Sequence, residues 1–271
     1  MSLVSTGWLS NNKKKVKLID CSWHMPSTNR DPYNEYIKEH IEDAIFFDLE
    51  KNSNQNTDLP HMLPDKKSWE KIVSSMGISN NDQIIIYDNS DVVSSCRCWF
   101  TFIYFGHEPS LVSILNGGIK KWKLENRSVV NSLSKFKTSN YFAKEKKDLI
   151  KNKKEINQNI LKKKFNVVDA RNQNRFDGIE PEPRKNLRSG SIPNSFCLPF
   201  NEIINQKDKT FLEINIIREK FLKLGINNEK NVVFSCGSGI TATVLGLAYS
   251  LINDKYLPII YDGSWAEYGK I

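Results

Sequence analysis

Short apolar runs alternate along this chain with longer segments whose apolar residues recur at helical spacing. The runs are rich in β-branched residues and lie at residues 18–19, 84–86, 167–168 and 232–234. The helical segments lie at residues 68–76, 94–105 and 214–224. Strands that alternate with helices are typical of α/β units around a mostly parallel sheet. The pattern therefore predicts an α/β fold in which helices flank such a sheet.

The order of these elements occurs twice. The matching segments are residues 18–22 with 167–171, 36–44 with 187–195, and 83–88 with 231–236. The two members of each match lie about 150 residues apart, and this constant offset is the signature of an internal repeat. A chain of 271 residues is long enough for two domains that each bury a core. We predict a first domain at residues 1–130, a linker at 131–155 and a second domain at 156–271.

A cysteine opens the turn that follows the last of these matching strands. Residues 231–235 form an apolar strand, Cys236 comes next, and Gly237 and Gly239 make the turn flexible before an apolar helical stretch. Such a turn surrounds the sulfur with backbone N–H groups and faces it toward a helix N-terminus, and both features favour a thiolate. The alternative is a structural cysteine, because free cysteines are often buried. The two glycines favour the reactive interpretation.

The residues around Cys236 exclude two common kinds of cysteine chemistry. A phosphatase loop would need an arginine six positions after the cysteine, and position 242 is alanine. A cysteine protease would need a histidine nearby in the fold, and the second half of the chain has none. The four histidines are His24, His40, His61 and His107. A thiolate of this kind suits attack on a soft electrophile such as sulfur.

The repeat indicates which half is active. Asp88 stands where Cys236 stands in the second half, so the first half has the turn without the nucleophile. The loop at residues 88–94 would also repel an anion. We expect the first domain to be catalytically silent and to supply one wall of the site.

Further motifs carry a family resemblance. They occur in order along nearly the whole chain, at residues 20–23, 40–41, 46–48, 61–64, 116–118, 169–171, 175–176, 180–184, 235–241 and 261–265. Together they resemble the tandem-domain rhodaneses, and among these the 3-mercaptopyruvate sulfurtransferases. The resemblance implies two rhodanese-like domains and a persulfide that forms on Cys236 during catalysis.

Charge placement separates two subfamilies. Thiosulfate sulfurtransferases carry cations inside the loop, typically as Cys-Arg-Lys-Gly, whereas this chain has the neutral Gly237 and Ser238. The cations that would bind the substrate are instead Arg175 and Arg184, and Arg184 lies within the sequence Pro-Glu-Pro-Arg. A guanidinium matches a carboxylate bidentately, which suits an α-keto acid. The alternative for each arginine is a surface ion pair.

The resemblance also implies a relay of serine, histidine and acid that handles protons near the transferred sulfur. Ser238 and His61 match the first two positions, and Glu50 falls at the acid position where the family usually has aspartate. Asp48 is the alternative acid. Without the resemblance, His61 would be an ordinary loop histidine. Backbone N–H groups of the substrate-binding loop are expected to stabilise the negative sulfur, and the residues concerned are Gly237, Gly239, Ile240 and Thr241.

The predicted reaction moves sulfur from 3-mercaptopyruvate to Cys236, releases pyruvate, and passes the sulfur to a thiol such as reduced thioredoxin or to cyanide. No metal and no organic cofactor is expected. Two alternatives stay open: a thiosulfate sulfurtransferase, and a non-catalytic persulfide carrier. A carrier would not need the two arginines. The acceptor, the oligomeric state and the pathway do not follow from the sequence.

Cysteine usage and hydropathy indicate the compartment. Five cysteines, an odd number without regular spacing, favour a reducing environment, and Cys96 and Cys98 lack the second pair of a zinc site. No apolar run of 18 residues is present, so no membrane span is expected. Residues 1–12 are polar and lack a signal core. We predict a cytoplasmic protein, and import of a longer precursor into an organelle stays open.

The net charge of +8 raises the possibility of nucleic-acid binding. Residues 131–164 alone contain 11 lysines against three acidic residues, so this one stretch accounts for 11 − 3 = +8. The stretch has no arginine and few aromatic residues. A solvated, lysine-rich linker explains the charge better than a surface that recognises bases. We therefore expect no nucleic-acid partner.

Overall fold

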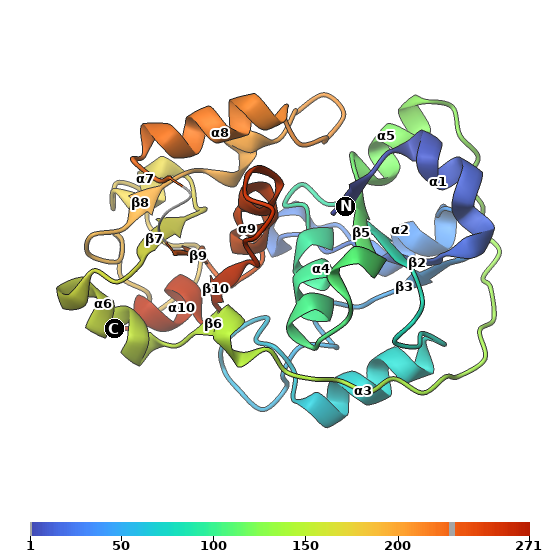
Figure 1. Cartoon of the computed structure of the whole chain (residues 1–271), viewed down its shortest axis with the longest axis horizontal. Coiled ribbons are helices and arrows are strands. Elements are labelled where there is room, and N and C mark those ends of the chain that lie inside the picture. Colours follow the sequence, from blue (N-terminus) through green and yellow to red (C-terminus); the bar gives the residue numbers. More distant parts are fainter. Residues whose placement is uncertain (1, 228–230) are drawn as a thin grey trace. The chain divides into compact units, whose positions relative to one another are not determined.

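The computed structural model describes residues 2–227 and 231–271, and these residues form two compact units (Figure 1). The first unit contains residues 1–55, 63–146 and 206–210. The second contains residues 56–62, 147–205 and 211–271. Each unit therefore includes one short segment from the other half of the sequence, in addition to its own repeat.

The first unit is built on a parallel sheet. Its five strands within the described residues are β1 Leu3–Val4, β2 Lys17–Asp20, β3 Ala44–Phe46, β4 Ile84–Tyr87 and β5 Val112–Leu115. Their order across the sheet is β1-β5-β4-β2-β3, and every neighbouring pair is parallel. The centre of this sheet reads as continuous apolar sequence because parallel sheets are covered on both faces. All four residues of β4 are buried accordingly.

The second unit repeats that sheet. Its five strands within the described part of the chain are β6 Ile150–Lys151, β7 Asn166–Asp169, β8 Phe196–Cys197, β9 Val232–Ser235 and β10 Ile259–Tyr261. Their order is β6-β10-β9-β7-β8, again parallel throughout. Strand by strand this is the order of the first sheet. The predicted α/β fold with two tandem domains is confirmed.

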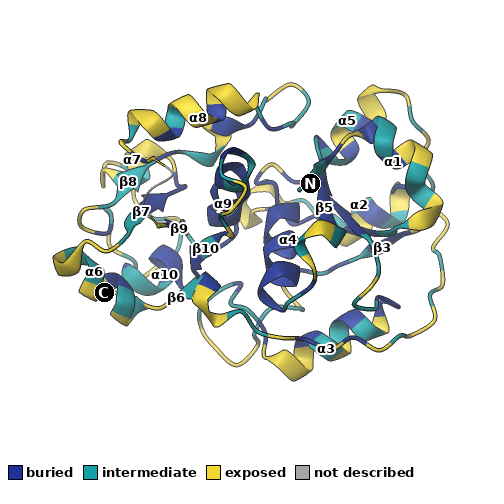
Figure 2. Cartoon of the chain, viewed as in Figure 1, coloured by how far each residue is buried: buried dark blue, intermediate teal, exposed yellow. Residues whose placement is uncertain are grey.

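Helices cover the sheet of the first unit. They are α1 Thr6–Asn12, α2 Pro32–Lys38, α3 Lys66–Ser75, α4 Ser95–Tyr104 and α5 Gly118–Leu124. In α3 only Trp69 and Val73, four positions apart, are buried, so one face packs inward. Asp65 caps this helix by accepting a hydrogen bond from the Ser68 N–H. All ten residues of α4 are buried, as Figure 2 shows.

The helices of the second unit follow the same scheme. They are α6 Lys153–Lys162, α7 Gln173–Phe176, α8 Ile214–Lys223, α9 Thr241–Ile252 and α10 Ser264–Tyr268. In α8, Ile217 and Phe221 are buried while the outer face is exposed (Figure 2). Most of α9 is buried on all sides. The helical segments predicted at 68–76, 94–105 and 214–224 correspond to α3, α4 and α8.

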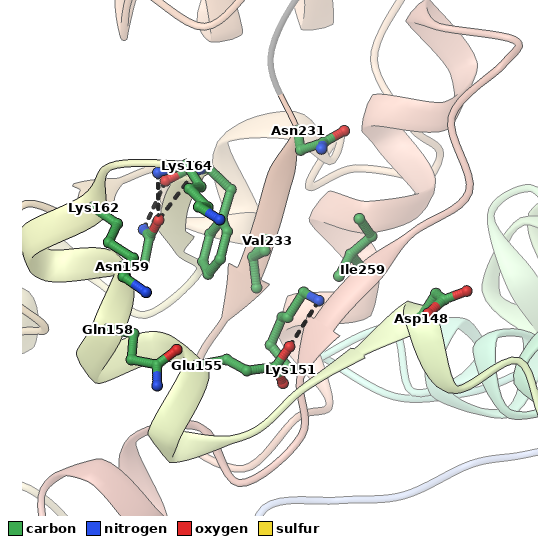
Figure 3. A pocket seen from close by; sticks show the side chains of 11 residues that line it. Asp148, Lys151, Glu155, Gln158, Asn159, Lys162, Lys164, Asn231, Val233 and Ile259 are labelled. Carbon is green, nitrogen blue, oxygen red and sulfur yellow. Dashed lines mark hydrogen bonds and ion pairs between the residues drawn. The ribbon is translucent and has the colours of Figure 1, made fainter.

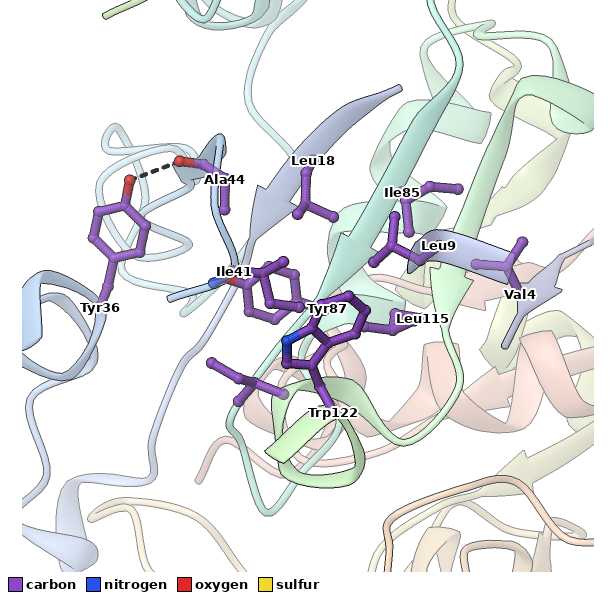
Figure 4. Close-up of a cluster of buried hydrophobic side chains, with 11 residues drawn as sticks. Val4, Leu9, Leu18, Tyr36, Ile41, Ala44, Ile85, Tyr87, Leu115 and Trp122 are labelled. Carbon is purple, nitrogen blue, oxygen red and sulfur yellow. Dashed lines mark hydrogen bonds between the residues drawn. The ribbon is translucent and has the colours of Figure 1, made fainter. Parts of the chain in front are cut away.

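Each unit has its own hydrophobic core. In the first unit, Figure 4 shows Leu18 of β2, Ile85 of β4 and Trp122 of α5 within one cluster of buried side chains. The Tyr36 hydroxyl lies in the same cluster and donates to the Ala44 carbonyl at 2.7 Å. In the second unit the cluster is formed by Ile156, Val167, Ile192, Val233, Tyr261 and Trp265. The core residues come from strands and from the inward faces of helices, as the sequence pattern predicts.

The lysine-rich connector is more ordered than its composition suggests. The Tyr141 side chain is buried, and the Lys144 N–H donates to the Phe105 carbonyl at 2.8 Å. Gly106 has a φ of +82°, and a Cβ there would stand 2.6 Å from the Lys144 carbonyl oxygen. The connector therefore packs on the first unit instead of crossing solvent as a free linker. Its last residues, expected to be linker up to 155, already form β6 and the first turn of α6.

No described helix has both the length and the apolar character that crossing a membrane requires.

Candidate active site

Cys236 lies where β9 ends, and its surroundings hold the sulfur in place. The side chain is buried, and Sγ accepts a hydrogen bond from the Gly239 N–H at 3.1 Å. Gly239 has a φ of +80°, a conformation that glycine adopts without strain. The Cys236 N–H donates to Ser264 Oγ at 3.1 Å, and the Trp265 N–H donates to the Cys236 carbonyl at 2.9 Å. The loop is thus fixed from the start of α10 as well as from within.

Ile240 and Thr241 stand at the start of the helix that follows the loop. Ile240 precedes α9 and is buried, and Thr241 is its first residue. A helix N-terminus presents unsatisfied N–H groups and a partial positive charge. This end of α9 therefore favours a negative sulfur on Cys236, and Gly239 supplies the direct hydrogen bond.

Ser238 and His61 lie side by side in the second unit. His61 Nδ1 and Ser238 Oγ share a hydrogen bond of 2.9 Å, and both side chains are buried. His61 belongs to the segment 56–62 that this unit takes from the first half of the sequence. Its φ of +59° is unusual for a residue with a side chain, and such strain is concentrated at functional positions. The fold thus brings together two residues that lie 177 positions apart.

Arg175 and Arg184 converge on the residue after the cysteine. Arg175 lies on α7, and Arg184 lies in the loop that follows. A Cβ built on Gly237 would stand 3.3 Å from Arg175 Nη2 and 3.6 Å from Arg184 Nη1. Arg184 Nη2 also donates to Ser238 Oγ at 3.3 Å. Two guanidinium groups therefore border the space beside the loop, where a side chain at position 237 would crowd them.

A buried ion-pair network supports Arg175. Glu182 accepts from Arg175 Nη2 at 2.5 Å and from Arg171 Nη1 at 2.6 Å. Arg171 in turn pairs with Asp169 at 2.7 Å and stacks on the Trp265 ring, 4.4 Å from its centroid. Burial alone would lower the pKa of the Arg171 guanidinium, but the Asp169 and Glu182 carboxylates outweigh it, so the pKa is raised.

Arg171 and Glu182 belong to the network that holds Arg175, a role that the sequence pattern did not predict. Arg171 follows the repeated strand, and Glu182 lies two residues before Arg184. The alternation of acidic and basic residues at 169, 171, 182 and 184 was the available signal.

Glu50 lies in the first unit, where it contacts a tryptophan. Trp23 Nε1 donates to Glu50 Oε1 at 2.7 Å. Asp48, the alternative acid, pairs with Lys51 at 3.1 Å. The assignment of an acid partner for His61 stays a prediction.

A separate cavity of about 430 Å³ lies near the N-terminal end of β9, whereas Cys236 follows the C-terminal end of that strand (Figure 3). Asn231 lines the cavity just before β9 begins. Four strand residues span about 13 Å, so the cavity is remote from the thiol. Lys151 and Glu155 form an ion pair on its wall. This cavity has no part in the chemistry of Cys236.

Among the residues that the structure describes, no group of three or more histidine, cysteine, aspartate or glutamate side chains is arranged to hold a metal ion.

Comparison with known proteins identifies the family. The model of the rhodanese-like domain matches residues 5–125 and again residues 152–270. The chain belongs to the rhodanese family. Both copies of the domain coincide with the repeats in the sequence and with the two parallel sheets.

Relatives of this rhodanese are named as sulfurtransferases. The thiosulfate/3-mercaptopyruvate sulfurtransferase 1, mitochondrial, of Arabidopsis thaliana is 34% identical, over 98% of this chain and 75% of its own length. The 3-mercaptopyruvate sulfurtransferase of Mus musculus is 34% identical, over 98% of this chain and 91% of its own. The thiosulfate sulfurtransferase of Bos taurus is 32% identical with the same coverage. The prediction that the chain is a sulfurtransferase is confirmed.

Solved structures agree with this assignment. The Tum1 protein of Saccharomyces cerevisiae superposes with a TM-score of 0.90 at 27% identity, covering 99% of this chain and 94% of that one. SseA of Escherichia coli, described as a 3-mercaptopyruvate sulfotransferase, gives a TM-score of 0.87 at 26% identity, with 98% and 99% covered. The arrangement of two rhodanese domains in one chain is therefore shared with experimentally determined structures.

Proposed function

We propose that this rhodanese takes sulfur from 3-mercaptopyruvate, holds it as a persulfide on Cys236, and passes it to a thiol. The observation that carries the proposal is the convergence of Arg175 and Arg184 beside Gly237. Two planar cations next to a neutral loop suit a carboxylate with an adjacent keto oxygen. A sulfonate held inside the loop would need cations at positions 237 and 238, which are glycine and serine.

In the first step the Cys236 thiolate attacks the sulfur of the substrate. The new S–S bond forms while the carbon–sulfur bond breaks, and the electron pair of that bond passes to the methylene carbon as the enolate of pyruvate. The proton of the substrate thiol moves to this carbon, so Cys236 is left as a negatively charged persulfide. Ser238, hydrogen-bonded to His61 at 2.9 Å, is the group placed to carry that proton.

In the second step an acceptor thiol attacks the outer sulfur. The Cys236 thiolate leaves, the acceptor becomes a persulfide, and the acceptor proton stays with it. The Gly239 N–H, which already donates to Sγ, and the N-terminus of α9 favour the negative charge in each state. Reduced thioredoxin and, in an assay, cyanide are the acceptors we expect.

Thiosulfate is the second candidate donor, because relatives named for it match as much of the chain as those named for 3-mercaptopyruvate. Steady-state assays with both donors and one thiol acceptor test the proposal. We expect kcat/KM for 3-mercaptopyruvate to exceed that for thiosulfate. A higher value for thiosulfate would overturn the donor assignment, and a protein that loads sulfur from neither donor would be a persulfide carrier.

The cytoplasmic location stays a prediction. The Arabidopsis relative carries "mitochondrial" in its name, so fractionation of cells with the full-length native protein is the deciding measurement.

A further inference from the structure

Glu182 is a fully enclosed carboxylate near the candidate active site. Its side chain is 1% exposed and lies between two guanidinium groups. Oε1 accepts from Arg171 Nη1 at 2.6 Å and from Arg175 Nε at 3.2 Å, and Oε2 accepts from Arg175 Nη2 at 2.5 Å. Arg175 is therefore held through two of its nitrogens, which fixes the plane of its guanidinium.

The same contacts determine the charge that Arg175 brings to the site. Asp169 pairs with Arg171, and Glu182 pairs with both Arg171 and Arg175, so two carboxylates face two guanidinium groups. The formal charges of these four side chains sum to zero. Arg175 thus offers hydrogen-bond donors beside Gly237 while its charge is compensated at 2.5 Å.

We propose that Glu182 is a positioning residue that sets donor specificity. It aims Arg175 at the donor and cancels its charge, so the site favours a donor with one negative charge over a donor with two. The keto acid has one charge, on its carboxylate, and thiosulfate has two. This inference rests on the proposed function and names the residue that enforces the choice of donor.

Coulomb's law gives the direction of the test. If Glu182 became neutral, the site would gain one positive unit, and a dianion would be stabilised twice as much as a monoanion at the same distance. The ratio of the two donors would therefore shift toward thiosulfate. If Glu182 had a purely structural role, its replacement would instead lower kcat/KM for both donors together. Arg171, which pairs with Glu182, also stacks on Trp265, and the backbone N–H of Trp265 donates to the Cys236 carbonyl.

Glu182→Gln and Glu182→Asp form the matched pair. The glutamine removes the charge and keeps the length, while the aspartate keeps the charge and is too short to bridge both arginines. For Glu182→Gln we expect the ratio of kcat/KM for thiosulfate to that for 3-mercaptopyruvate to rise about tenfold, and the rise should shrink with added salt. For Glu182→Asp both values should fall while their ratio stays unchanged. An unchanged ratio in a folded Glu182→Gln protein would overturn the inference.

Glu180→Gln is the second variant, should Glu182→Gln fail to fold. Glu180 lies on the same loop, and its carboxylate accepts hydrogen bonds from the exposed Asn172 and Asn174 without contacting the buried network. We expect the donor ratio to move in the same direction, by about twofold, because this charge is exposed to solvent. No shift here, in a folded protein at low salt, would equally overturn the inference.

Loading of the wild-type protein separates the two proposals. If mass spectrometry shows that 3-mercaptopyruvate does not load Cys236 of the wild type, the proposed function fails. If the wild type is loaded and the variants leave the donor ratio unchanged, only the role of Glu182 fails.

Discussion

The loop after β4 in the first unit and the loop after β9 in the second occupy the same place in their sheets. Asp20 pairs with Tyr87 in one sheet and Asp169 pairs with Ser235 in the other, so Asp88 and Cys236 are equivalent. Each side chain accepts hydrogen bonding from backbone N–H groups in the segment that follows it. Asp88 accepts from the Ser90 and Ser95 N–H groups at 2.8 Å, and Cys236 Sγ accepts from the Gly239 N–H at 3.1 Å.

The surroundings of the two loops differ in charge. In the second unit Arg171 stands two residues after Asp169, whereas Ser22 stands two residues after Asp20 in the first. Burial raises the pKa of Asp20 to about 6 and also raises the pKa of Asp88, although both accept hydrogen bonds. The anion-binding turn is thus common to both units. The sulfur transfer that we propose uses a nucleophile and two arginines in addition, and Cys236, Arg175 and Arg184 all lie in the second unit.

The nucleophile gives the sharpest contrast. Cys236→Ser should abolish sulfur transfer, a loss of at least about a thousandfold, because serine cannot form a persulfide. Mass spectrometry after exposure to the donor should find an added ~32 Da on the Cys236 peptide. Asp88→Cys places a thiol on the equivalent loop and should stay unloaded, and Cys197→Ser should leave turnover nearly intact. Stable sulfur on Cys96 or Cys98 would contradict the assignment.

The equivalent aspartates should respond oppositely to neutralisation. Asp169→Asn breaks a buried pair with Arg171 and should cost about 3–5 kcal/mol in unfolding free energy.

Asp20 has a folded pKa raised from 3.8 to about 6, so its stabilising contribution is present below pH 4 and is lost as pH rises through 6. Asp20→Asn should therefore remove that loss and stabilise the protein at pH 7.5 by up to roughly 3 kcal/mol. Urea unfolding at pH 4.5 and 7.5 measures both variants. If Asp169→Asn and Asp20→Asn lowered the free energy of unfolding equally at pH 7.5, the arginine that stands beside Asp169 and not beside Asp20 would not account for the difference between the two loops.

The arginines test whether the second loop owes its activity to a carboxylate clamp. Arg175→Lys or Arg184→Lys keeps the charge and removes the two-pronged geometry, so kcat/KM for 3-mercaptopyruvate should fall about ten- to a hundredfold. Arg30→Lys is the control, because Arg30 donates to the Asn89 carbonyl in the loop that follows β4 of the first unit. If both Arg175→Lys and Arg184→Lys keep the wild-type kcat/KM for 3-mercaptopyruvate, the two arginines have only a structural role and do not bind the donor.

The smallest effect is expected from moving cations into the active loop. The double variant Gly237→Arg, Ser238→Lys should raise kcat/KM for thiosulfate several-fold and lower it for 3-mercaptopyruvate, because the cations then lie where a sulfonate would bind. Asp91→Lys adds a cation to the exposed part of the loop after β4 in the first unit and should leave the donor ratio as it is. If the double variant also leaves it unchanged, the loop does not set specificity.

The sequence was sufficient for features that depend on local order. Strand-turn-helix patterns predicted both sheets, and the repeat alone predicted that Asp88 and Cys236 occupy equivalent positions. Ser238 and His61 were paired only through the family resemblance, since nothing local to either residue connects positions 177 apart. The structure puts them 2.9 Å apart, at hydrogen-bond distance.

Features that depend on tertiary contacts were beyond the sequence. The network around Glu182 joins residues 7 and 11 positions apart, and the chain between them leaves α7 at Phe176 and continues as a loop, so no regular element predicts the contacts. Lysine content indicated a solvated connector, but Tyr141 and the carbonyl contact at Gly106 hold it against the first unit. Glu50 was assigned through the family resemblance and its spacing from Phe46-Phe47; its carboxylate accepts from the Trp23 indole, and its role as the acid partner stays a prediction. For the Glu182 network and for the connector, tertiary contacts determine what neither local spacing nor composition indicates.

Each unit includes a short segment from the other repeat, residues 206–210 in the first unit and 56–62 in the second, so cutting the chain between the repeats does not separate the two units. A fragment of residues 147–271 would retain Cys236, Ser238 and both arginines, but it would leave His61 behind with residues 56–62. A cut anywhere between residues 62 and 147 has the same result. The second repeat alone therefore encodes the nucleophile but not the histidine bonded to Ser238. A single ancestral copy of this repeat would have needed a second copy of itself, or another source of that histidine, to assemble the same site.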